Sequence, residues 1–154
     1  MRHYFLFFCF AVLGAAPLTA QKEAKPEKAI KNVINLFFEG LEKGDTTLLR
    51  STCTASPVLQ TYMKDKEGQL RVFTEDFDEF IAFIGIPSKD KYKEVIEFDA
   101  IHAEEALASV WTPYTFYVNG KVSHTGTNSF QLVKTGEGWK IQYILDTRRK
   151  PEQK

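Results

Sequence analysis

The sequence predicts an α+β fold, a cone-shaped α+β barrel in which three N-terminal helices pack on a long curved antiparallel sheet. Two observations indicate this fold. Apolar residues recur at helical spacing mainly before residue 85, whereas residues 94–147 alternate in the manner of strands. Asn119-Gly120 also provides a strong two-residue hairpin signal between two of those strands. A long, bent sheet with helices on one face encloses a hollow, so we expect a cavity.

The helical part begins at Pro26, which suits the first turn of a helix. The apolar residues that follow lie on one helical face: Ile30, Val33, Ile34, Phe37 and Leu41. Gly44 stands where a helix ends, and Asp45 can cap a second short helix. We expect a third helix that Thr74 or Asp76 caps and that Gly85 ends.

The strands are predicted from alternation and turn residues. Residues 57–73 read as a hairpin with its turn at 65–68. Four further strands are expected at 94–102, 106–118, 122–134 and 139–147. Pro113 interrupts the second of these four, which indicates a sheet edge or a bulge.

The N-terminus is typical of a secretory signal. Arg2 precedes an apolar run at residues 4–13, and small residues lead to Ala20. We therefore expect a cleaved signal peptide at residues 1–20, a single domain at 26–149 and a polar tail at 150–154. The protein would then be periplasmic or secreted and would keep no stable membrane span.

Composition limits the classes of partner. The chain has 20 basic and 20 acidic residues, so it lacks the basic surplus of a nucleic-acid binder. Without the signal, Cys53 is the only cysteine, which leaves no internal disulfide. His102 and His124 are far apart in the sequence and make no metal-binding spacing. We expect no metal and no cofactor.

Strand parity indicates which side chains face the hollow. On the strand at 122–134, His124, Asn128 and Phe130 share one face that we expect to point inward. On the last strand, the face of Trp139, Ile141, Tyr143 and Leu145 is expected inward. That parity places Asp146 on the other face unless a bulge intervenes. The expected pocket comprises Tyr62, Trp111, Tyr114, His124, Asn128, Phe130 and Tyr143.

His124 has three open interpretations: a core or rim histidine, a pocket-lining residue, or a general acid/base near neutral pH. Asp146 is either an ion-pair partner at a strand end or a base at the cavity mouth. The tyrosines and Trp111 could equally be packing residues. No other candidate base is expected to face inward.

The sequence resembles the nuclear transport factor 2-like cone fold, which includes SnoaL-like polyketide cyclases and ketosteroid isomerase. More narrowly, it resembles the lumazine-binding branch of small exported bacterial proteins. The matching stretches are Gly44-Asp45-Thr46, Leu59-Gln60-Thr61, Val110-Trp111-Thr112-Pro113-Tyr114, Ser129-Phe130-Gln131-Leu132, Gly138-Trp139-Lys140-Ile141 and Asp146-Thr147-Arg148. The resemblance implies a cavity, frequent homodimers through the open sheet face, and, in the enzymes, an Asp or His–Asp pair as general base.

Three functions follow as hypotheses. The first is an exported protein that holds a small apolar or aromatic molecule in the cone. The second is a proton-transfer enzyme, an isomerase, cyclase or dehydratase, that uses His124 as general acid/base. The third is a structural or interaction domain whose cavity is filled by its own side chains. We also expect a homodimer, because the small polar residues at 123–131 form a flat outer face.

Overall fold

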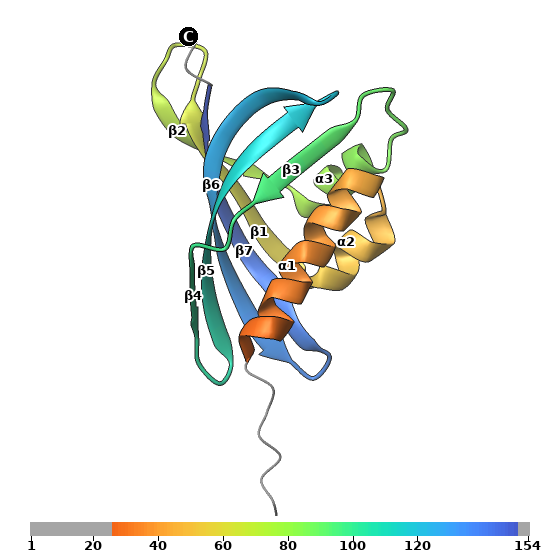
Figure 1. Cartoon of the computed structure of the whole chain (residues 1–154), viewed down its shortest axis with the longest axis vertical. Helices are drawn as coiled ribbons and strands as arrows, with labels where there is room; N and C mark the ends of the chain where they lie inside the picture. Colours follow the sequence, from red (N-terminus) through yellow and green to blue (C-terminus); the bar gives the residue numbers. More distant parts are fainter. Residues whose placement is uncertain (1–25, 151–154) are drawn as a thin grey trace, which may run out of the picture.

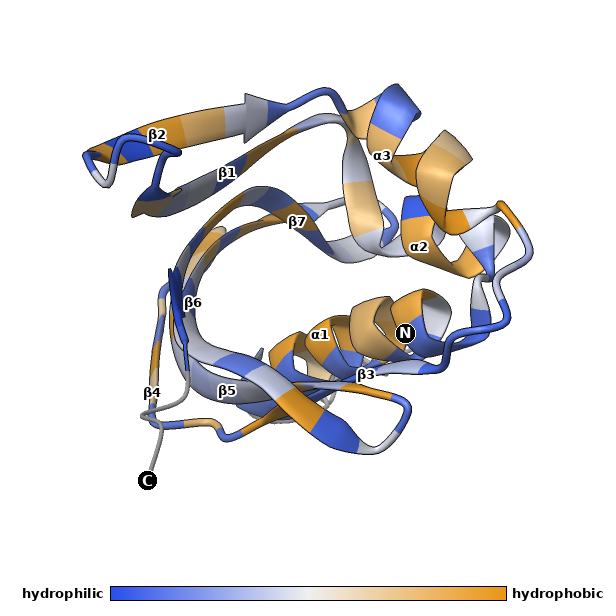
Figure 2. Cartoon of the chain, turned by 90° about the horizontal axis from the view of Figure 1, so that it is seen from above, coloured by the Kyte–Doolittle hydropathy of each residue, from blue (hydrophilic) through white to orange (hydrophobic). Residues whose placement is uncertain are grey.

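Three helices pack against the concave face of one curved sheet in the computed structural model, which describes residues 26–150 (Figure 1). The helices are α1 (Pro26–Lys43), α2 (Thr46–Thr52) and α3 (Phe77–Ile84). Seen from above, the sheet curls around and the helices close its open side (Figure 2). This confirms the predicted α+β cone.

The helix ends follow the predicted capping residues. Gly44 has a φ of +67°, which favours glycine, and it separates α1 from α2. The Asp45 side chain accepts a hydrogen bond from the Leu48 N–H and caps α2. Asp76 does the same for α3 through the Asp78 and Glu79 N–H groups. Gly85 follows α3 as its C-terminal cap.

Within the described part of the chain the sheet has seven strands: β1 (Cys53–Lys64), β2 (Leu70–Glu75), β3 (Tyr92–Ile96), β4 (Ala100–Ala103), β5 (Leu107–Val118), β6 (Lys121–Thr135) and β7 (Gly138–Arg149). Their order is β2-β1-β7-β6-β5-β3, and β4 also pairs with β5. All neighbours are antiparallel except β1 and β7, which are parallel. The sheet is therefore mixed, whereas the sequence predicted an antiparallel one.

The strand predicted at 94–102 is divided into β3 and β4. Pro113 lies within an unbroken β5, so no break occurs in its own strand. The interruption lies in the neighbouring segment between β3 and β4. There the Glu97 N–H donates to the Pro113 carbonyl and the Asp99 N–H donates to the Trp111 carbonyl. Because Pro113 has no N–H to donate, the neighbouring segment loses its regular pairing there.

The core lies between α1 and the sheet. Ile30 and Ile34 of α1 are completely buried, as are Phe130, Leu132 and Ile141 of β6 and β7. The Phe37 and Phe130 rings meet edge to face with centroids 6.4 Å apart. These contacts fix α1 over the concave face of the sheet.

A one-residue bulge in β7 reverses the direction of the side chains after it. Leu132 pairs with Ile141 and Gln131 pairs with Tyr143, which leaves Gln142 as the extra residue. Trp139 and Ile141 face the core as predicted, but beyond Gln142 the prediction is wrong. Ile144 is buried and Asp146 faces inward, while Tyr143 and Leu145 face outward.

No helix within residues 26–150 is long and apolar enough to cross a membrane. The predicted signal peptide at residues 1–20 and nearly all of the predicted tail lie outside the described residues.

Candidate functional site

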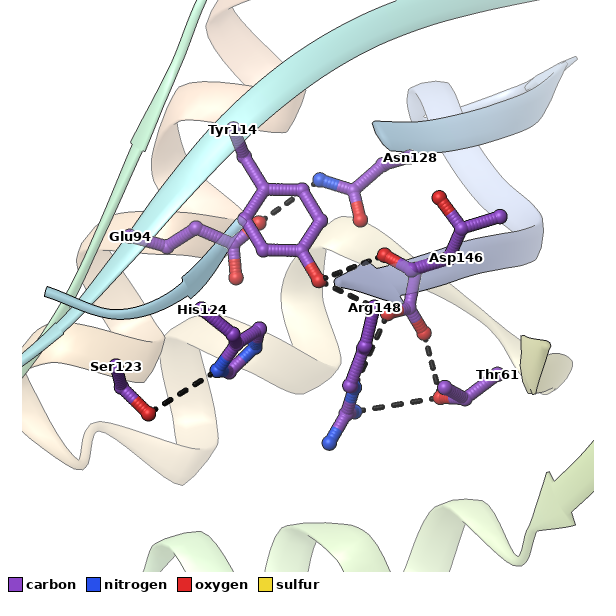
Figure 3. Close-up of polar contacts among 9 residues, drawn as sticks. Thr61, Glu94, Tyr114, Ser123, His124, Asn128, Asp146 and Arg148 are labelled. Atoms are coloured by element: carbon purple, nitrogen blue, oxygen red, sulfur yellow. Dashed lines mark hydrogen bonds and ion pairs between the residues drawn. The ribbon is translucent and has the colours of Figure 1, made fainter. Parts of the chain in front are cut away.

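A cavity of about 320 Å³ lies between the helices and the concave face of the sheet. Six phenylalanines line it: Phe37 and Phe38 from α1, Phe80 and Phe83 from α3, Phe116 from β5 and Phe130 from β6. We call these six residues the aromatic wall. Aliphatic side chains and polar side chains of the strands line the rest. We call Thr61, Glu94, Tyr114, Asn128, Asp146 and Arg148 the polar wall (Figure 3).

The strand register brings the polar wall together. Asn128 of β6 pairs with Asp146 of β7, which pairs with Thr61 of β1. On the adjacent row, Tyr114 pairs with Gly126, which pairs with Arg148. Residues from four strands that are distant in the sequence therefore meet at one place.

Asp146 is surrounded by donors (Figure 3). Thr61 Oγ1 donates to Asp146 Oδ1 at 2.5 Å, and Tyr114 Oη donates to Oδ2 at 3.1 Å. Arg148 Nε lies 3.1 Å from the same Oδ2 and forms an ion pair with it. A second Arg148 nitrogen donates to Thr61 Oγ1 at 3.2 Å. The charges of Asp146 and Arg148 therefore compensate each other.

Glu94 is the second carboxyl group of the polar wall, and it has no basic partner. Asn128 Nδ2 donates to Glu94 Oε1 at 2.8 Å, and within residues 26–150 Glu94 forms no ion pair. Burial raises the pKa of Glu94 to about 7, and the nearby Asp146 adds to the rise. The Asn128 hydrogen bond and Arg148 lower it in part. Glu94 is thus able to exchange a proton near neutral pH.

The Tyr114 ring packs against Gly126 on the neighbouring strand β6. A Cβ on Gly126 would overlap the Thr147 carbonyl oxygen and stand 2.6 Å from the Tyr114 ring, so only glycine fits there. The Tyr114 hydroxyl also donates to the Thr147 carbonyl at 3.0 Å. Burial, and then Asp146 and Glu94, raise the Tyr114 pKa, so the phenol remains protonated and acts as a donor.

His124 lies beside the polar wall without a carboxylate partner among the described residues. Its ring stacks on Phe116 at 4.8 Å and meets Tyr114 edge to face at 5.8 Å. Its Nδ1 is 3.2 Å from Ser123 Oγ. Burial, and then Arg148, lower the His124 pKa, with a partial offset from Asp146. The imidazole is therefore mainly neutral at pH 7.

The structure brings some of the predicted site residues together and separates others. Tyr114, His124, Asn128, Phe130 and Asp146 all line the cavity. Tyr62, Trp111 and Tyr143 do not line it, and for these three the predicted position was wrong.

In each case the side chain is on the outer face of its strand, away from the cavity. Trp111 alternates with the buried Val110 and Thr112, so it is on the outer face and 49% exposed. Tyr62 follows Thr61, which points inward, and Tyr62 itself is 39% exposed. The β7 bulge turns Tyr143 outward, where its hydroxyl donates to Gln60 Oε1 at 2.7 Å.

Sequence reasoning missed Glu94, Thr61 and Arg148, and it expected no inward carboxyl group. A signal for Glu94 was present, because Glu94 shares its parity with Ile96 and Phe98, which pack against the core. Asp146 and Arg148 carried no such signal, since a bulge is not visible in alternation. No group of three or more metal-ligating side chains occurs within residues 26–150.

Solved structures share this fold. A nuclear transport factor 2-like protein of unknown function from Shewanella baltica OS155 superposes with a TM-score of 0.62 at 17% identity, covering 81% of this chain and 94% of its own. A proposed dehydratase of the nuclear transport factor 2-like family from Streptomyces avermitilis gives 0.61 at 13%, covering 80% and 96%. A Nostoc punctiforme domain of unknown function with a cystatin-like fold gives 0.60 at 17%, covering 82% and 79%.

At these low identities, the superpositions establish the fold and not the activity. The chain therefore has the nuclear transport factor 2-like cone fold that its sequence resembles. No protein-family model and no curated protein matches the sequence. The lumazine-binding branch stays a prediction.

Glu94→Gln should change how stability depends on pH. The folded-state pKa of Glu94 is raised from 4.5 to about 7, so the carboxyl stabilises the fold below pH 4.5 and that contribution is lost as pH rises to 7. The free energy of unfolding of the variant minus that of the wild type should therefore increase by on the order of 3 kcal/mol from pH 4.5 to pH 8. Urea unfolding at both pH values measures this. The exposed Glu104→Gln is the control, and parallel pH profiles for all three proteins would contradict the assignment.

Proposed function

We propose that the chain is an exported protein that binds a small molecule in the cone, with the apolar or aromatic part of the ligand against the aromatic wall and its polar end at the polar wall. The observation that carries the proposal is the cavity of about 320 Å³, which has apolar surfaces and a few convergent polar groups. That combination is typical of small-molecule sites. A cavity of this volume weighs against the hypothesis that the cone is filled by its own side chains.

Export is part of the proposal because of the signal-like residues 1–20. Cys53 is consistent with an oxidising compartment, since it is buried and burial raises its pKa to about 11. A buried protonated thiol reacts slowly with oxidants and with other thiols. N-terminal sequencing of the protein purified from its source would show Gln21 first if the signal is cleaved, and Met1 if it is not.

Leu41→Trp should abolish binding without unfolding the chain. Leu41 is half-buried on α1 at the cavity, so an indole there occupies space that a ligand needs. Glu39→Trp is the matched control, because Glu39 is exposed on the same helix and loses only a surface ion pair with Lys43. Native mass spectrometry of protein purified from its source should show a bound small molecule in the wild type and the control, and none in Leu41→Trp. A wild type without any bound mass would refute the proposal.

A proton-transfer enzyme is the second candidate, and the raised pKa of Glu94 favours it. A carboxyl group with a pKa near the working pH is well suited to general base catalysis. Glu94 fits that role better than His124, because burial lowers the His124 pKa. In this arrangement Tyr114 and Arg148 hold Asp146 in place through hydrogen bonds, and Glu94 takes a proton from carbon.

Proton exchange on an aromatic ketone tests this candidate. For 2-tetralone in deuterated buffer near pH 7, the enzyme hypothesis predicts loss of the α-proton NMR signals faster than in buffer alone. Glu94→Gln should slow this exchange about a hundredfold or more, the scale of a lost general base. A larger loss in His124→Gln would instead assign the base to the histidine. Exchange at the buffer rate in every protein would leave the binding function as the better account.

A homodimer through the outer sheet face is also proposed. Between residues 125 and 131 the outward residues of β6 are small or polar, and exposed or half-buried aromatic residues such as Trp111 and Tyr143 lie on the same side. Sedimentation equilibrium at micromolar concentration should give twice the chain mass, and Trp111→Glu should shift it toward the monomer. A wild type that remains monomeric would contradict this assembly.

A further inference from the structure

We propose that the ligand carries a positively charged nitrogen on an aromatic or apolar body, and that this nitrogen binds at Glu94. The inference rests on the proposed binding function and names the chemical class of its ligand. Three features of the cavity support it: an unbalanced negative charge, a carboxylate oxygen without a partner, and a wall of phenylalanine rings.

The charges that line the cavity do not cancel. Among the described lining residues there are three carboxyl groups, Glu75, Glu94 and Asp146, and one guanidinium, Arg148. Arg148 is engaged by Asp146 and Thr61. His124 is held mainly neutral, because burial lowers its pKa. With Glu94 ionised, the cavity therefore has a net negative charge, and a cation entering it is attracted.

The geometry at Glu94 provides a place for that cation. Its Oε1 accepts one hydrogen bond, from Asn128, and its other oxygen has no partner within residues 26–150 (Figure 3). An ionised carboxylate has room for about four hydrogen bonds. An ammonium or amidinium group would donate hydrogen bonds to the oxygen that has no partner. Such charge-assisted hydrogen bonds are stronger than hydrogen bonds between neutral groups. No lysine or arginine of the described chain takes that place.

The aromatic wall favours the same class of ligand. Phe116 of β5 pairs directly with Glu94 of β3, so both side chains line the same part of the cavity, where the Phe116 ring stacks on His124 and Tyr92. Phe37, Phe38 and Phe80 from the helices line the opposite side. The faces of such rings attract a cation, most strongly where water is excluded. The ionised Glu94 would repel an anionic ligand. Arg148, which could attract one, is already paired with Asp146.

The binding of a cation should depend on pH through Glu94. The charged or titratable groups that share the cavity with Glu94 are Asp146 and Arg148 from β7, His124 from β6, Tyr114 from β5 and Glu75 from β2. From α1 and α3 the cavity receives only apolar side chains. Since the Glu94 pKa is about 7, the carboxylate is available at pH 8 and largely protonated at pH 5.5. Cation affinity should therefore rise with pH across this interval.

Three indoles of similar shape test the inference: tryptamine, which is cationic, tryptophol, which is neutral, and indole-3-acetate, which is anionic. Calorimetric titration at pH 8 should give tryptamine an affinity about tenfold or more above tryptophol, the scale of one charge-assisted bond. Indole-3-acetate should bind more weakly still. Glu94→Gln should bring tryptamine and tryptophol to similar affinity, whereas the exposed control Glu104→Gln should keep the preference.

The outcomes separate this inference from the proposed function. If tryptophol binds as tightly as tryptamine, or if Glu94→Gln keeps the preference, the cation inference is overturned and the binding cavity stands. If none of the three indoles binds, the cation inference is overturned, and the native mass spectrometry of the wild type decides the binding function. Should Glu94→Gln fail to fold, the wild type alone is sufficient: the preference for tryptamine must shrink at pH 5.5, and a preference equal at both pH values overturns the inference.

Discussion

The burial of Glu94 without a basic partner is the constraint on which the account of this site depends. A carboxyl group in an aromatic cavity loses hydration, and the one nearby guanidinium, Arg148, is already paired with Asp146. The group therefore carries its charge at a cost, and its pKa rises to about 7. Such a cost is typical of functional sites, because a ligand or a reaction can recover it.

The sheet holds this arrangement in place through two irregular positions. The extra residue Gln142 turns Asp146 and Arg148 toward the hollow, where regular alternation would have placed Tyr143 and Leu145. Gly126 leaves the space in which the Tyr114 ring lies, between the Asp146 carboxylate and His124. Both positions sit on long central strands, so the polar wall rests on rigid backbone instead of on loops.

Most of the fold could be predicted from the sequence, because its signals are local. Capping at Asp45 and Asp76, helical spacing along α1 and the Asn119-Gly120 turn each depend on a few adjacent residues. Parity placed His124, Asn128 and Phe130 on the inward face, since β6 is regular between them. Parity failed for Asp146 and Tyr143, because a bulge depends on pairing between strands. Glu94 has the inward parity of Ile96 and Phe98, but its importance comes from neighbours on β5, β6 and β7, which its own strand does not reveal.

The fold itself leaves the ligand open, so the decisive evidence must come from the site. The central claim is that Glu94 is a buried carboxyl group with no basic partner. Carbon-13 NMR titration of the glutamate side-chain carboxyls, with Glu94 assigned from the resonance lost in Glu94→Gln, tests it most directly. The account predicts that this resonance titrates near pH 7. A Glu94 resonance that titrates near 4.5, the ordinary value for the group, would contradict it.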